Sequence, residues 1–222
     1  MINVLSRESA STWLDLVETT PSLVFDPEIC RRQWNDLSSA LPGVTLYYAV
    51  KSNPYPGLLQ TIANEGGHFD VASAAEIKML EHEGVHASCM IHTHPIKTDA
   101  EIEKAVAAGV TTFVVDNVDE LWKLIPYRHS IRVMLRLSFI APDAPIDLSR
   151  KFGAPQQDAL SILDVANDSG IRVDGLCFHV GSQAATANTH ADALGVCLDL
   201  CEQIKAEGLP EILRIDIGGG FP

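Results

Sequence analysis

The sequence has none of the features that direct a chain into a membrane or out of the cell. Its 222 residues include no apolar run long enough to span a bilayer. The first residues, Met1-Ile2-Asn3-Val4, lack both the basic flank and the long apolar stretch of a secretory signal. These absences predict a cytoplasmic protein with no membrane partner.

Cysteine pairs and positive charge are also scarce. The five cysteines form no Cys-x-x-Cys pair. Cys197 and Cys201 fall on one predicted helix, where we expect them to behave as small buried apolar residues. Cysteines without such pairs are consistent with a protein in a reducing compartment. The net charge of −13 argues against nucleic acid or an anionic membrane surface as a partner.

What the chain does contain, after residue 40, is a repeated order of short apolar strand, polar turn and amphipathic helix. Strands separated by helices in this way predict a parallel sheet. No Gly-x-Gly-x-x-Gly opens the first helix, which disfavours a dinucleotide-binding sheet. The predicted strands are 45–50, 68–72, 88–92, 111–115, 131–137, 174–180 and 212–217, and the predicted helices are 55–65, 74–83, 98–108, 117–125, 156–169 and 187–207.

Polar side chains stand at the carboxyl end of nearly every predicted strand. In a (β/α)8 barrel these ends form one active-site rim, whereas a doubly wound sheet would concentrate them at one switch point. We therefore predict an α/β fold of the (β/α)8 barrel type, with seven of its strands visible before Pro222. The predicted domains are an extension over 1–40, made of strand 20–26 and helix 27–40, and an incomplete barrel over 41–222.

Lys51 lies at the mouth of the first predicted barrel strand, which Ser52-Asn53-Pro54 ends. Burial there would lower the pKa of the lysine and free its amine to form a Schiff base. The alternative is a lysine that extends from the strand end into solvent. Taken alone, the residue favours the solvent-exposed alternative. The motifs further along the chain favour the Schiff-base interpretation instead.

Two loops on the rim have the composition of a phosphate site. Strand 174–180 leads into His179-Val180-Gly181-Ser182, where a glycine lets the backbone approach a ligand and a serine hydroxyl can bond to phosphate. Strand 212–217 leads into Gly218–Gly220, whose bare N–H groups can form an anion nest, although such a triplet alone more often makes a tight turn. Together the two loops favour a phosphorylated cofactor. His179 would stack on its aromatic ring or, equally, have a structural role.

His92 and His94 form a His-x-His pair with both side chains on one face of a strand. Such a pair can bind a metal, but the sequence offers no third ligand. We expect no metal site.

Five motifs, in this order, carry a resemblance to a known family: Tyr48-Ala49-Val50-Lys51-Ser52-Asn53-Pro54, Phe69-Asp70-Val71-Ala72-Ser73, Lys151-Phe152-Gly153, His179-Val180-Gly181-Ser182 and Asp216-Ile217-Gly218-Gly219-Gly220-Phe221-Pro222. With them the chain resembles the pyridoxal-phosphate-dependent amino-acid decarboxylases of alanine-racemase fold, which act on ornithine, lysine, arginine or diaminopimelate. The resemblance extends over the chain from Thr20 onward.

The resemblance implies a role for each matching position. Lys51 would hold pyridoxal 5'-phosphate as a Schiff base, His179 would stack on the pyridine ring, and these two are the implied catalytic residues. Glu76 and Lys151 match positions near the site. The implied cofactor-binding set is Lys51, Asp70, Arg136, His179, Ser182, Gly218, Gly219 and Gly220.

The implied reaction is decarboxylation of a basic amino acid such as ornithine or lysine to an amine, in a homodimer of the full-length form. The sequence departs from the family in having no Glu-Pro-Gly-Arg segment of an eighth strand and no C-terminal β-domain. We expect a fragment or partial subunit of such an enzyme. The alternatives are a diaminopimelate decarboxylase, a racemase of the same fold, and a non-catalytic cofactor-binding or regulatory homologue.

Overall fold

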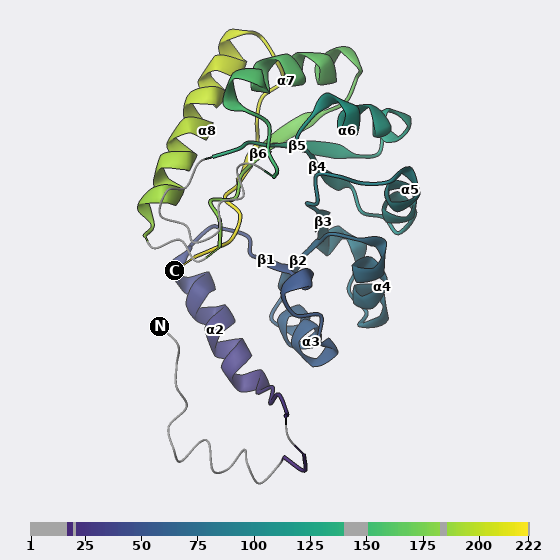
Figure 1. Cartoon of the computed structure of the whole chain (residues 1–222), viewed down its shortest axis with the longest axis vertical. Helices are drawn as coiled ribbons and strands as arrows, with labels where there is room; N and C mark the ends of the chain where they lie inside the picture. The colour runs from purple at the N-terminus through teal and green to yellow at the C-terminus, as the bar shows by residue number, and fades with distance from the viewer. Residues whose placement is uncertain (1–16, 20, 140–150, 183–185, 222) are drawn as a thin grey trace.

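The fold is an open barrel of seven parallel strands that follow one another in chain order, β1 to β7. The computed structural model describes residues 17–19, 21–139, 151–182 and 186–221. The strands lie inside and the helices outside (Figure 1). All seven predicted strands are confirmed, each somewhat shorter than expected: β1 Tyr47–Ala49, β2 His68–Val71, β3 Met90–His92, β4 Thr112–Val115, β5 Arg132–Arg136, β6 Val173–Cys177 and β7 Arg214–Asp216.

The six helices predicted between the strands are confirmed as well. Thr98 and Glu101 form the two reciprocal bonds of a capping box at the start of α5 (Asp99–Ala107), which fixes where this helix begins. Gly84 and Gly109 adopt positive φ angles of 76° and 96° after the ends of α4 (Ala74–His82) and α5, a conformation that costs glycine little. These helices are α3 Pro56–Asn64, α4 Ala74–His82, α5 Asp99–Ala107, α6 Val118–Lys123, α7 Ala159–Asp168 and α8 Asn188–Ala206.

The inner strands β3, β4 and β6 are buried on both faces, as is usual in parallel sheets, whereas the outer strands β1 and β7 are not. On β4, Phe113 and Val115 belong to the large core that includes helix residues, whereas Val114 packs with Met134 and Cys177 in a separate small cluster. This alternation follows from the two-residue period of a strand. It leaves the polar residues at the strand ends free to surround the mouth of the barrel.

The segment before the barrel differs in part from the prediction. Helix α2, Pro27–Ala40, is confirmed, and Asp26 caps it by accepting the N–H group of Glu28 at 2.8 Å. The strand predicted over 20–26 is wrong for residues 21–26, which form no strand, and Thr20 lies outside the described residues. The β-branched and apolar residues there give local strand propensity, but they have no neighbouring strand to pair with, and Leu23 is fully exposed.

Helix α2 lies against the first turn of the barrel. Arg31 forms an ion pair with Glu65 at 2.8 Å, just after α3. Trp34 lies so close to Gly67 that a Cβ atom at this glycine would be 2.7 Å from the indole ring. These contacts join the helix to α3 and β2, while the domain boundary at residue 40 stays a prediction.

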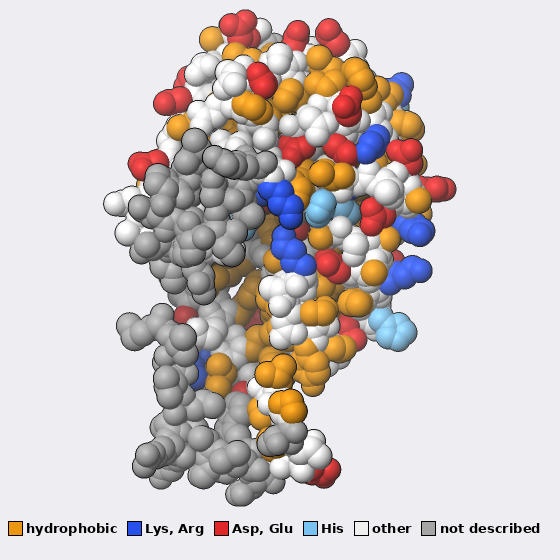
Figure 2. Space-filling model, viewed as in Figure 1, with side chains coloured by type: hydrophobic (Ala, Val, Ile, Leu, Met, Phe, Trp, Pro, Cys, Tyr) orange, Lys and Arg blue, Asp and Glu red, His pale blue; other side chains and the backbone are white. Residues whose placement is uncertain are grey.

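Hydrophobic side chains make up part of the surface. Figure 2 shows them on both the upper and the lower part of the visible face. Among the exposed large hydrophobic residues are Val24 and Tyr55, which are exposed by 44% and 50%. None of the described helices is long and apolar enough to cross a membrane. All five cysteines are free thiols.

Candidate active site

A cavity of about 1280 Å³ opens between the barrel and α2. This volume is large enough for a cofactor and a substrate together. The predicted residues that line it are Lys51, Asp70, Arg136, His179, Gly218, Gly219 and Gly220. The structure therefore brings together seven of the eight residues of the implied cofactor-binding set.

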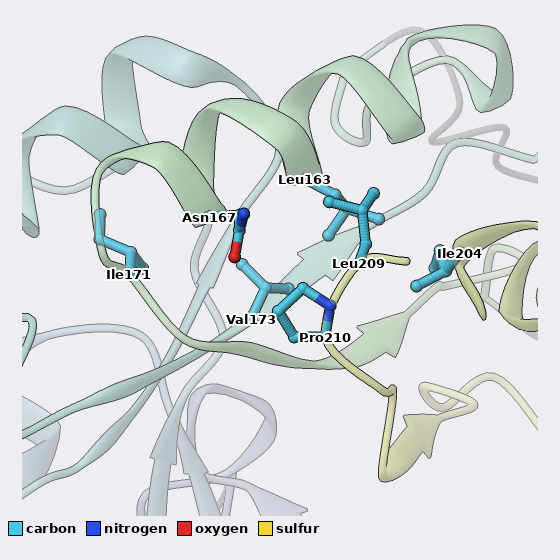
Figure 3. A pocket seen from close by; sticks show the side chains of 7 residues that line it. All are labelled: Leu163, Asn167, Ile171, Val173, Ile204, Leu209 and Pro210. Carbon is cyan, nitrogen blue, oxygen red and sulfur yellow. The ribbon is translucent and has the colours of Figure 1, made fainter. Parts of the chain in front are cut away.

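A second, much smaller pocket lies between α7, β6 and the loop after α8 (Figure 3). Its side chains are mainly apolar, among them Leu163, Val173 and Leu209, and its volume is only about 10 Å³. A space of this size holds at most one water molecule. The large cavity is therefore the candidate active site.

Lys51 lies on a single 3₁₀ turn, Val50–Ser52, that follows β1 directly. Hydroxyl groups hold the turn, since Ser52 donates to the carbonyl of Ala49 at 2.7 Å and its oxygen lies 3.0 Å from the hydroxyl of Tyr48. The expectation of a buried amine is wrong, because Lys51 is exposed at the open side of the cavity. Its position, and not its desolvation, makes it available to a ligand.

Asp70 lies at the end of β2, and its carboxylate accepts a hydrogen bond from the Thr93 hydroxyl. Burial raises the pKa of Asp70 to about 6, although the Thr93 bond and the charge of Lys51 act in the opposite direction. A carboxyl group with this pKa can hold or release a proton near neutral pH.

Arg136, the last residue of β5, lies over the ring of Phe152 at 5.2 Å. Its buried Nε atom has no hydrogen-bond partner among the described residues. Phe152 is itself fixed, because His94 packs edge-on against it at 5.5 Å and Asp116 accepts the N–H group of Gly153 at 2.9 Å. The loop around Phe152 thus positions Arg136, whose donor remains available to a ligand.

His179 follows β6, and its Nδ1 atom accepts the N–H group of Gly181 at 3.0 Å. Burial, together with the positive charges of Arg136 and Lys51, lowers the pKa of His179 to about 4. The imidazole is therefore neutral at pH 7. A neutral planar ring that is held from one side can stack on an aromatic ligand.

The turn Gly218–Gly220 packs tightly against the loop after β6. A Cβ atom at Gly218 would lie 2.3 Å from the carbonyl oxygen of Phe178, and one at Gly220 would lie 2.0 Å from that of Gly181. Gly219, by contrast, has no atom within 4 Å of its Cβ position. Asp216 accepts the N–H group of Gly218 at 2.8 Å, and burial raises the pKa of its carboxyl group.

Three other nominated residues stand apart from the cavity wall. Ser182 is exposed and does not line the cavity, so its phosphate contact stays a prediction. Glu76 accepts the N–H group of Ala72 at 2.8 Å and so stabilises the start of α4. Lys151 lies over the ring of Phe152 at 5.1 Å.

His92 and His94 do not converge on a common point. His94 Nδ1 lies 2.7 Å from the backbone carbonyl of Ile96, and the ring of His92 stacks on Phe113 at 5.8 Å. Among the described residues, no group of three or more potential ligands could hold a metal ion.

Replacing His92 with leucine should stabilise the fold. Both ring nitrogens of His92 are buried without a hydrogen-bond partner among the described residues, so removing them should raise the free energy of unfolding by about 1–2 kcal/mol at pH 7. Burial and the charge of Lys97 lower the pKa of His92 to about 3. The wild type therefore loses stability as the pH falls below about 6.5, which is the pKa of histidine in the unfolded chain. The stability gained by His92→Leu should accordingly be larger at pH 5 than at pH 7.

Urea denaturation at pH 7 and at pH 5 measures this effect. The matched control is His82→Leu on the exposed side of α4, which should change stability by less than about 0.5 kcal/mol. A His92→Leu variant with the same pH dependence as the wild type would contradict the prediction.

Replacing Asp70 with asparagine should change the pH dependence of stability in the opposite sense. The pKa of Asp70 is raised to about 6, so the folded chain retains a proton that the unfolded chain releases between pH 4 and pH 6. The contribution of the Asp70 carboxyl group to the free energy of unfolding is therefore lost as the pH rises from 4 through 6. Relative to Asp70→Asn, the wild type should lose about 1 kcal/mol between pH 5 and pH 7.5.

Denaturation of both proteins at the two pH values, without added ligand, gives this difference directly. The comparison with the asparagine variant cancels the opposite slopes from His92 and His179. Asparagine also retains an oxygen that can accept the Thr93 hydroxyl. Parallel curves for the two proteins would show that Asp70 is ionised in the folded chain already at pH 5.

Several residues of the site were not predicted from the sequence. Thr93 bonds to Asp70 across distant parts of the chain, which no local pattern announces. Phe152 belongs to one of the five motifs, but its contact with Arg136 was not predicted. His190, on α8, also reaches the glycine turn from a distance. Asp216 did carry a signal, because an aspartate two residues before a glycine is typical of an Asx turn.

Comparisons with known proteins agree with this geometry. Residues 28–222 match the family model described as "Pyridoxal-dependent decarboxylase, pyridoxal binding domain". The chain is 36% identical over 203 residues to the lysine/ornithine decarboxylase of Selenomonas ruminantium, which is 91% of this chain and 51% of that protein. It is 34% identical over 183 residues to antizyme inhibitor 2 of Xenopus laevis, which is 82% of this chain and 40% of that protein.

Among solved structures, the lysine/ornithine decarboxylase from Vibrio vulnificus complexed with cadaverine has a TM-score of 0.90 and 41% identity, over 99% of this chain and 58% of that one. The chain thus spans about half the length of the curated relatives it matches. The resemblance that five short motifs carry is confirmed, and so is the barrel predicted from the order of strands and helices and the polar strand ends.

Proposed function

Since the chain belongs to the pyridoxal-dependent decarboxylase family, we propose that it is the cofactor-binding part of an enzyme that decarboxylates a basic amino acid to an amine. The observation that carries this proposal is the position of Lys51, whose amine stands at the rim of a cavity that also holds Asp70, Arg136, His179 and the glycine turn. The cadaverine complex of the Vibrio vulnificus relative supports lysine or ornithine as substrate.

The residues present fit pyridoxal 5'-phosphate, which combines an aldehyde, an aromatic ring and a phosphate. Lys51 offers the amine for covalent attachment, and the neutral ring of His179 offers a flat surface. Gly219 leaves one side of its turn open to an anion. Arg136 has a buried donor without a partner among the described residues. We propose that these residues, with Asp70, hold the cofactor.

The chemistry follows from what each side chain can do. When bound, pyridoxal phosphate supplies the electron sink that stabilises the carbanion left by loss of CO2. The positive charge of Lys51 acts on the carboxyl group of Asp70, which can hold or release a proton near neutral pH beside the ligand. His179 stays neutral and therefore adds no positive charge against the ring. Walls formed by Arg136 and the glycine turn orient the ligand.

The test is covalent labelling followed by an activity measurement. The chain is incubated with pyridoxal phosphate and reduced with borohydride, and the modified lysine is located by peptide mass mapping. We expect modification at Lys51, with a visible absorbance band before reduction. Labelling that is absent, or spread over the exposed lysines, would disprove the proposal. Release of CO2 is then measured from lysine, ornithine and diaminopimelate.

A second candidate function is cofactor binding or regulation without turnover. It is favoured by one observation, the similarity to antizyme inhibitor 2. Specific labelling of Lys51 with no CO2 release from any of the three amino acids, from this chain or from a chain extended to the length of its relatives, would support it. Release from diaminopimelate alone would reassign the substrate.

We further propose that the full-length protein is a homodimer. The outer strands of the barrel and α2 support this, because β1, β7 and α2 are only partly buried in the structure. Exposed strand edges and apolar helix faces are sites of association. Light scattering of the full-length protein gives the oligomeric state directly.

A further inference from the structure

His190 lies in the first turn of α8, close behind the glycine turn. Its side chain is only 8% exposed, and it does not itself line the cavity. The resemblance to the decarboxylases assigned it no role. Two of its contacts, however, lead to the segment that would bind the phosphate, namely those with Gly219 and Phe221.

The imidazole of His190 is held on its flat face and bonded at one nitrogen. It stacks on Phe221 with ring centroids 5.0 Å apart and an angle of 13° between the planes. Its Nε2 atom lies 3.3 Å from the carbonyl oxygen of Gly219. A carbonyl oxygen only accepts hydrogen bonds, so Nε2 carries the proton and donates it to Gly219.

Holding the Gly219 carbonyl sets the orientation of the next N–H group. A trans peptide is planar, and its C=O and N–H groups point in opposite directions. When the carbonyl of Gly219 points to His190, the N–H group of Gly220 points away from α8. The rest of the turn is already fixed, by Asp216 at Gly218 and by the close approach of Gly220 to Gly181.

We infer that His190 is a positioning residue for phosphate binding: its hydrogen bond to the Gly219 carbonyl turns the Gly220 N–H group toward the phosphate of the cofactor. This inference rests on the proposed function. It names His190 as a determinant of affinity for the phosphorylated form of the ligand in particular.

The test compares His190→Phe with His190→Gln. Phenylalanine keeps the ring that stacks on Phe221 but cannot donate a hydrogen bond, whereas the amide of glutamine places a donor near the Nε2 position. Dissociation constants are measured by absorbance titration for pyridoxal phosphate and for pyridoxal, which has no phosphate. His190→Phe should weaken pyridoxal phosphate about three- to tenfold and pyridoxal by less than about twofold, while His190→Gln should retain near wild-type affinity for both.

The outcomes separate this inference from the proposed function. If the wild type binds neither ligand, the proposed function fails. If the wild type binds pyridoxal phosphate and His190→Phe binds it equally well, or loses both ligands equally, only the inference fails. Circular dichroism checks the fold of each variant. Should His190→Phe not fold, the glutamine variant compared with His190→Leu gives the same contrast between a donor and none.

Discussion

A chain with alanine in place of Lys51 is expected to show no visible absorbance band with pyridoxal phosphate and to carry no borohydride-stable label. Only a primary amine can condense with the aldehyde, with loss of water, and Lys51 is the lysine that lines the candidate cavity. Lys97 is buried, with its amine bonded to three carbonyl oxygens, and is therefore not available as a replacement. The expected effect is complete loss of the adduct.

Two further variants make the Lys51 result specific. Lys51→Arg keeps the positive charge beside Asp70 but has no amine that condenses, so it should also lose the adduct. Lys78→Ala, on the exposed surface of α4, should keep both the band and the label. Equilibrium dialysis should still detect non-covalent binding to Lys51→Ala, since the glycine turn and Arg136 remain. A label that survives in Lys51→Ala would place the attachment at another lysine.

Much of the fold could be predicted because local pattern and tertiary structure agree in the barrel. The strands from β2 to β6 are short apolar runs, and the helices between them have capping residues and terminal glycines that fix their ends. The strand over 20–26 failed for the opposite reason. Its local propensity is that of a strand, but strand formation needs a neighbour, and the sequence does not say where one lies.

The lining of the cavity was predictable where a motif and a strand end coincide, as at Asp70, His179 and Gly218–Gly220, while the roles of these residues stay predictions. The exposure of Lys51 was not predictable, because burial depends on what surrounds the turn and not on the turn itself. His190 is a second residue whose environment could not be predicted from the local sequence. It is separated by 29 positions from the Gly219 carbonyl that it bonds to, so only the packing of α8 brings the two together.

Lys97, which the sequence did not single out, is a buried lysine whose amine is bonded to backbone carbonyl oxygens. It is 2% exposed, yet its Nζ atom donates to the carbonyl oxygens of His94 at 3.0 Å, Pro95 at 2.8 Å and Val114 at 2.6 Å. Burial lowers the pKa of Lys97 to about 8, which leaves the amine largely protonated at neutral pH. The side chain thus joins the loop after β3 to the end of β4.

Glu120 completes this buried group. Its carboxylate accepts the backbone N–H group of Lys97 at 3.1 Å and the amine of Lys123 at 2.6 Å, and it lies 4.0 Å from the Lys97 amine. The same loop carries Thr93, which bonds to Asp70, and His94, which packs on Phe152. A group that fixes this loop therefore also fixes one side of the candidate active site.

Replacing Lys97 with methionine should lower the free energy of unfolding by about 3 kcal/mol or more. Methionine nearly preserves the volume, so the loss comes from three carbonyl groups left without their donor in a buried site and from a carboxylate with one cation fewer beside it. Chemical denaturation measures the change. Lys104→Met, an exposed position on α5, is the matched control and should stay within about 0.5 kcal/mol of the wild type. A loss below about 1 kcal/mol for Lys97→Met would mean that water reaches the three carbonyls and that the buried amine is not what holds the loop.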